Sequence, residues 1–105
     1  MSDNLPISEQ YRIVAKKWVD AEAAASLMED TKSAVLSQQM QALGDMPVSR
    51  AEMQVKASDD WKEFIEKMIE ARKQANLFKV QLEYLRMRSA EWTSEEATKR
   101  AEMKL

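Results

Sequence analysis

The chain has 105 residues, of which 16 are basic and 18 acidic, with one Gly, two Pro, no Cys and no His. These counts exclude a disulfide scaffold, a zinc, copper or iron site of the usual kind and a Ser-His or Cys-His nucleophile, so neither an enzyme nor a bound cofactor is expected. A net charge of −2 gives no global attraction to nucleic acid or anionic membranes, and no apolar run approaches the ~20 residues that span a bilayer, which favours a soluble, cytoplasmic protein.

The first predicted element is a helix from about residue 7 to residue 43. Pro6 is tolerated only in a first turn, so the helix begins close to it. Apolar residues then recur at alternating steps of four and three, the pattern of a coiled-coil seam that only Lys32 interrupts. We call this apolar line the seam of the first helix; its members are Ile7, Tyr11, Val14, Trp18, Ala21, Ala25, Met28 and Val35.

A turn over residues 44–48 ends this helix. Gly44 can adopt the left-handed conformation that follows a helix, and Pro47 cannot continue one. Ser49 and Glu52 then have the spacing of a capping box, in which each side chain satisfies a backbone amide of the other residue. A second helix is therefore predicted to begin near Ser49.

The second helix is predicted to run from about residue 49 to 92, with a helical extension over residues 93–105. Its seam follows the same steps through Ala57, Trp61, Phe64, Met68, Ala71, Ala75, Phe78, Leu82, Leu85, Ser89 and Trp92. A break at residues 58–60 is an alternative, because Asp60 and Glu63 also have a capping spacing. Thr93 and Glu96 share that spacing, so either continuation or a kink is expected there.

Two helices of this length predict an all-α rod, a single-domain antiparallel hairpin resembling a coiled coil. Paired residues have numbers that add up to between about 89 and 96, depending on the register. The lower register sets Trp18 against Ala71, and the higher sets Trp18 against Phe78 and Ala25 against Ala71. In both registers Trp92 lies beyond the beginning of the first helix.

Self-association is predicted from apolar side chains that the hairpin does not bury. A second partial stripe is formed by Ile13, Val19, Leu27, Leu36, Val55, Ile65, Ile69, Leu77, Val80 and Tyr84. Two stripes on one rod favour a homodimer or higher homo-oligomer, with a four-helix bundle as the expected arrangement. The candidate surface for the second copy or for an unidentified protein partner consists of Leu85, Met87, Trp92 and Met103.

Charged residues of the second helix suggest two further sites. A basic stretch could contact phosphates as a nucleic-acid interface, consisting of Arg72, Lys73, Lys79, Arg86 and Arg88. The acidic stretch of residues 59–70 before it carries a net charge of the opposite sign, and such blocks also set the register of paired helices. The acidic residues are interleaved with Lys62 and Lys67, so no metal site is expected and a solvated face is favoured.

Part of the chain resembles small helical proteins encoded by tailed phages and prophages. The resemblance rests on Glu91-Trp92 with the ending Ala97-Thr98-Lys99-Arg100-Ala101-Glu102-Met103-Lys104-Leu105, and on the segments 71–76 and 85–88. It implies a phage-type accessory protein of the host cytoplasm and transfers no functional residue. The expected function is a non-enzymatic interaction or adaptor protein, with a nucleic-acid accessory protein of replication or recombination as the alternative.

Overall fold

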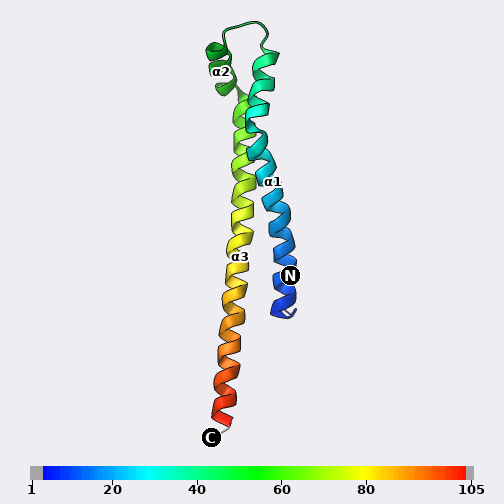
Figure 1. The fold of residues 1–105 in the computed structure, drawn as a ribbon, viewed down its shortest axis with the longest axis vertical. Helices are drawn as coiled ribbons and strands as arrows, with labels where there is room; N and C mark the ends of the chain where they lie inside the picture. Colours follow the sequence, from blue (N-terminus) through cyan, green and yellow to red (C-terminus); the bar gives the residue numbers. More distant parts are fainter. Residues whose placement is uncertain (1–3, 104–105) are drawn as a thin grey trace.

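The computed structural model describes residues 4–103, and in that range it contains three α-helices and no strand. They are α1 (Ile7–Ala42), α2 (Val48–Lys56) and α3 (Asp59–Met103). Helices α1 and α3 run antiparallel along most of the molecule, with α2 at the turn end (Figure 1). The dimensions are 83 × 22 × 17 Å and the radius of gyration is 23.1 Å, against ~13 Å for a compact chain of this size. The predicted all-helical rod is confirmed, while residues 104–105 of the predicted extension lie outside the described range.

The turn after α1 forms as its residue types predict. Leu43 is the C-cap of α1, and Gly44 follows with a φ of 87°. The Gly44 amide donates a hydrogen bond to the Gln41 carbonyl oxygen at 3.1 Å, which satisfies one of the free carbonyls at the helix end. The chain then reverses towards α2.

The predicted capping box at Ser49 is wrong. Helix α2 already begins at Val48, with Pro47 as its N-cap, and no side chain caps it. The Ala51 amide donates to the Pro47 carbonyl at 3.0 Å, so the first helical hydrogen bond closes two residues before the expected cap. Proline has a fixed φ and suits this position, which leaves Ser49 inside the first turn.

The predicted continuous helix over residues 49–92 is also wrong, because the chain breaks between Lys56 and Asp59. Ser58 makes the break: its hydroxyl donates to the Val55 carbonyl at 2.6 Å and accepts from the Trp61 amide at 3.2 Å. The alternative break at residues 58–60 is therefore the observed one, with Ser58 in the capping role in place of Asp60. Helix α3 continues without a break through Thr93, whose hydroxyl donates to the Ser89 carbonyl at 3.0 Å.

The break changes which residues of the second half are buried. It sets α2 beside the beginning of α3 and the end of α1 (Figure 1), with Ala51 and Val55 only 4% and 3% exposed. Val55 therefore belongs to the core and not to a second stripe. Ala57 is the exposed C-cap of α2, so the seam of α3 begins at Trp61, which is 6% exposed.

The seam between α1 and α3 has the higher of the two predicted registers. Val14, Leu82 and Leu85 form a buried cluster, against which Trp18 and Phe78 pack. Ala25 and Ala75 are both fully buried. Since an alanine has no side chain beyond Cβ, these two positions allow the helices to approach closely in the middle of the hairpin.

Candidate protein-interaction surface

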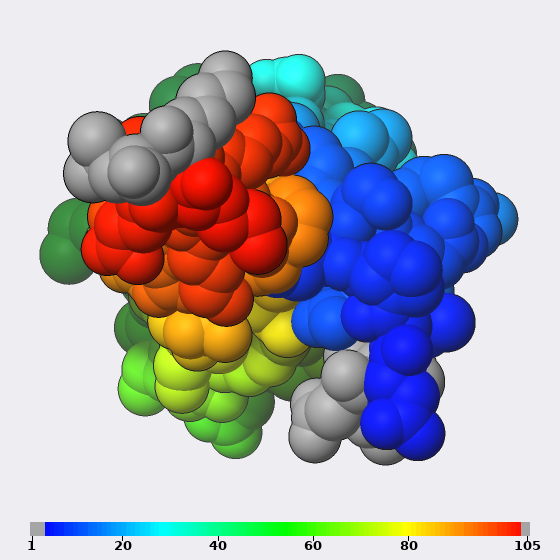
Figure 2. Space-filling model, turned by 90° about the horizontal axis from the view of Figure 1, so that it is seen from below, coloured from blue at the N-terminus to red at the C-terminus, as the bar shows by residue number. Residues whose placement is uncertain are grey.

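Helix α3 extends well past the beginning of α1 (Figure 1), and we call its residues 93–103 the overhang. Trp92 lies where the overhang begins and is 59% exposed, in a shallow depression shared with Leu5, Pro6 and Ile7. Figure 2 views the molecule from this end, with the end of α3 in front of the other elements. Trp92 was predicted to lie beyond the beginning of the first helix, but it lies beside that beginning, and the overhang follows it.

A second apolar feature lies along the side of α3 that faces away from α1. The side chains are between 52% and 62% exposed, and we call them the outer face: Ile69, Leu77, Val80, Tyr84 and Met87. Between Ile69 and Val80 the surface forms a shallow groove that is also lined by Lys73 and Asn76. Five large apolar side chains on one side of a helix form a patch of the kind that marks binding surfaces.

The four residues of the predicted partner surface do not form one patch. Leu85 is only 7% exposed and belongs to the core cluster with Val14, so its selection was wrong. It lies on the seam, where α1 covers it. Met87 lies on the outer face, while Met103 is 85% exposed at the far end of the overhang.

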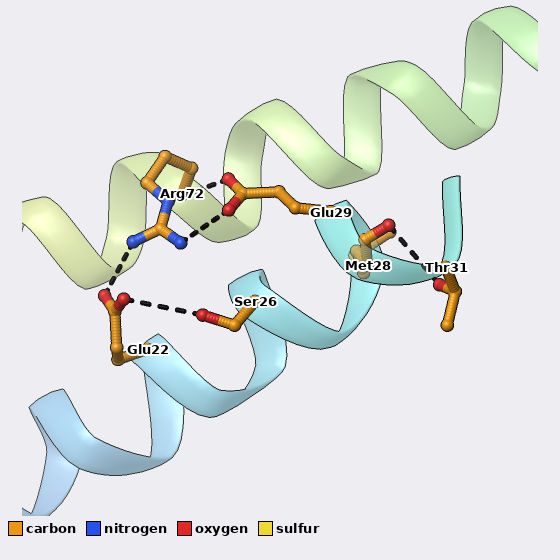
Figure 3. A network of polar contacts seen from close by, with 6 residues as sticks. All are labelled: Glu22, Ser26, Met28, Glu29, Thr31 and Arg72. Carbon is orange, nitrogen blue, oxygen red and sulfur yellow. Dashed lines mark hydrogen bonds and ion pairs between the residues drawn. The ribbon is translucent and has the colours of Figure 1, made fainter. Parts of the chain in front are cut away.

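Arg72, predicted as a phosphate contact, is held by two carboxylates of α1 (Figure 3). Its Nη1 donates to Glu22 at 2.6 Å, and its Nη2 and Nε donate to the two oxygens of Glu29 at 2.7 and 2.8 Å. The hydrogen bonds from Arg72 lower the pKa of Glu29, and both glutamates raise the pKa of Arg72. The Arg72 side chain is 30% exposed and already donates to three carboxylate oxygens, so it links α3 to α1.

The other predicted phosphate contacts are dispersed. The Arg86 Nη2 donates to the Tyr11 hydroxyl at 3.4 Å, and this hydrogen bond raises the pKa of Arg86. Lys73, Lys79 and Arg88 are exposed, with Arg88 beside Trp92 in the depression at the beginning of the overhang. Arg72, Lys79 and Arg86 share one flank of α3, but two of the three donate to groups of α1, and Lys73 and Arg88 lie outside that row, so the five cations do not form one free surface.

Sequence reasoning did not single out Glu22 and Glu29, which complete the Arg72 contacts. They lie seven residues apart on α1, and each immediately follows a seam residue, Ala21 or Met28. Arg72 likewise follows Ala71 on α3. Positions that flank a seam carry the ion pairs between coiled helices, so this spacing was the available signal.

The acidic stretch at the beginning of α3 has the surface character that its spacing predicts. Glu63 and Lys67 form an ion pair at 3.1 Å between adjacent turns, with both side chains more than 60% exposed. Within residues 4–103 no three His, Cys, Asp or Glu side chains are grouped so that they could hold a metal ion. None of the described helices is long and apolar enough to cross a membrane.

Comparisons with known proteins add no relative: no family model, no curated protein and no solved structure matches this chain.

Proposed function

We propose that the chain is a non-enzymatic, phage-type interaction protein, a helical homodimer that binds a host or phage protein in the host cytoplasm. The observation that carries this proposal is the outer face of α3. Burial of apolar surface stabilises a complex by ~25 cal/mol per Å², and each of the five outer-face side chains is at least half exposed in the single chain. A partner that covers this face removes the exposed apolar surface from water.

The hairpin gives this face a rigid support. Phe78 is a seam residue that packs against the core cluster of Val14, Leu82 and Leu85. In the sequence it lies between Leu77 and Val80, which belong to the outer face. The side chains of the outer face are therefore displayed from a helix that α1 holds in place. A protein partner that contributes its own apolar side chains fits this surface.

Two arrangements of a homodimer are compatible with these surfaces. Two hairpins can lie side by side as a four-helix bundle, which the second apolar stripe predicts, or they can meet end to end through the overhang. Light scattering on the purified protein is expected to give at least twice 12.1 kDa. A monomer throughout the micromolar range would contradict self-association.

Partner binding is tested by a matched pair of double variants. Leu77→Ser/Val80→Ser removes apolar surface from the outer face, and the control Val48→Ser/Met53→Ser changes exposed apolar residues of α2 that belong to neither apolar stripe. In affinity capture from host lysate with mass spectrometry, the protein retained by the wild type and the control should be lost from the outer-face variant. Equal retention by all three proteins would show that the outer face is not the binding surface.

A further inference from the structure

The overhang continues the seam of α3 beyond the end of α1. With the same steps of four and three, the seam positions after Trp92 are Glu96, Lys99 and Met103. Because α3 is one continuous helix, the heptad spacing places these positions on the side on which α1 packs earlier in the chain. The seam thus continues past α1 in the order Trp92, Glu96, Lys99, Met103. Trp92 borders the first residues of α1, and Glu96 is half-buried in the single chain.

We propose that a second copy of this chain covers the overhang, with the two overhangs antiparallel about a two-fold axis. This inference rests on the self-association in the proposed function and names the surface that mediates it. The occupant is identified by complementarity. In an antiparallel pair, Trp92 lies opposite the partner's Met103 and Glu96 lies opposite the partner's Lys99. The two-fold axis repeats both contacts.

The order of the four residues makes this overhang complementary to itself. When two such seams run antiparallel, they form four layers. Each of the two outer layers pairs Trp92 with Met103, and each of the two central layers pairs Glu96 with Lys99. The Trp and Met layers supply apolar burial, and the two central ionic layers fix the register, which is the best-attested role of polar seam positions. Trp92 would then be covered on the side left open by Leu5 and Pro6.

The length of the overhang selects this register. A deeper overlap by one heptad would set the partner's Met103 against Leu85. Helix α1 already covers Leu85, which is only 7% exposed. A shallower overlap by one repeat would pair Lys99 with Met103 and leave Trp92 and Glu96 without a partner among the described residues. The chosen register is thus the longest overlap that does not reach Leu85, which α1 buries.

The contact is small, and its flanks are not all favourable. The edges of the observed hairpin, where Arg72 meets Glu22 and Glu29, show which flanking positions approach each other. The same offsets place Arg100 near the partner's Thr93 and near the partner's Arg100, and the second of these is a like-charge contact. With about 11 residues from each copy, a dissociation constant in the micromolar range is expected.

The experiment is a charge swap measured by analytical ultracentrifugation of the full chain. Glu96→Lys or Lys99→Glu alone places two like-charge pairs in the centre of the contact and should raise the dimer dissociation constant at least ~10-fold. The double variant Glu96→Lys/Lys99→Glu restores both pairs and should return it to within ~3-fold of the wild type. The control is Glu91→Lys, at an exposed position off this seam, and it should change the dimer dissociation constant less than ~3-fold.

Three outcomes would overturn the inference in distinguishable ways. A wild-type monomer up to ~100 μM would overturn self-association together with this surface. A dimer that neither single variant weakens would overturn the overhang contact alone and favour the side-by-side bundle. Weakening by both single variants without recovery in the double variant would show that Glu96 and Lys99 do not face each other. Circular dichroism of each variant confirms that the helices are retained.

Discussion

At the scale of single residues, Arg72 decides between the two registers that the seam alone allows. Steps of four and three repeat along both helices, so a shift by seven residues leaves apolar residues facing apolar residues. In the higher register Arg72 lies between Glu22 and Glu29 and contacts both. In the lower register the corresponding positions are Ala15 and Glu22, with one carboxylate fewer. The ion pairs thus add the register information that the apolar pattern lacks.

Replacement of Arg72 tests this contribution through its pH dependence. Arg72→Met should lower the melting temperature by a few degrees at pH 7, since two carboxylates lose their partner and both are partly screened by water. Because Arg72 lowers the pKa of Glu29, its stabilisation is present above the ordinary Glu pKa of ~4.3 and is lost as the pH falls through the lowered value. Thermal melts should therefore show a difference from wild type that shrinks between pH 6 and pH 3.

Arg12→Met provides the control for that measurement. Arg12 also contacts a carboxylate whose pKa it lowers, that of Glu9, but the pair lies within α1 and the Arg12 side chain is 68% exposed. Its loss should change the melting temperature less than the loss of Arg72 does. An equal effect of the two variants would contradict a special role for the contacts between α1 and α3.

At the scale of elements, the break between α2 and α3 shows what a periodic pattern can and cannot predict. The apolar steps continue from Ala57 to Trp61 without a slip, so periodicity alone favours one helix. The local hydrogen bonds of Ser58 compete with that continuation, and the bend allows Ala51 and Val55 to enter the core. Burial elsewhere in the fold thus decided between two locally acceptable conformations.

Ser58 and Ser49 form a matched pair for testing which serine caps a helix. Ser58→Ala should lower the free energy of unfolding by about 1 kcal/mol, because the Trp61 amide loses its acceptor at the beginning of α3. Ser49→Ala should have little effect, since no side chain caps α2. Urea denaturation measures both variants. A larger loss for Ser49→Ala would show that the capping box forms in solution.

The close approach of α1 and α3 at their alanines can be tested in the same way. Ala75→Leu inserts a large side chain where the native residue is 0% exposed, and it should cost about 1–3 kcal/mol of stability through overpacking. Ala97→Leu makes the same substitution at an exposed position of the overhang and should be almost neutral. If both variants retained wild-type stability in urea denaturation, the helices would be further apart than the structure shows.

At the scale of the whole molecule, the sequence predicts the rod and most of its seam but not the site. Between Ile7 and Leu85, the apolar seam residues of α1 and α3 are all buried or half-buried, because the heptad pattern reports directly on which side of a helix is covered. Whether a given apolar residue remains uncovered depends on where the other helix ends. Leu85 and Trp92 lie on one seam, yet α1 buries only Leu85, because Trp92 lies where α1 begins. Identifying the exposed residues therefore required the register of the two helices.

The register also determines how many cations remain for nucleic acid. Arg72, Lys79 and Arg86 recur every seven residues along one flank of α3, but Arg72 and Arg86 both donate to groups of α1, and the exposed Lys73 and Arg88 lie outside this row. Since counterion release requires several phosphates to be neutralised together, no retarded band is expected in a gel shift with single- or double-stranded DNA even at ~50 mM salt. Steeply salt-dependent binding would instead support the nucleic-acid alternative.

The gel shift can also be used to look for a gain of DNA binding, in a variant whose Arg72 is released from its two carboxylates. Glu22→Gln/Glu29→Gln removes both carboxylates that hold the guanidinium and raises the net charge of the chain by two. If these carboxylates are what keeps α3 from phosphates, the variant should retard DNA at low salt where the wild type does not. Glu63→Gln/Glu66→Gln adds the same charge away from Arg72 and separates a local effect from a global one, because only a local effect requires the arginine to be released.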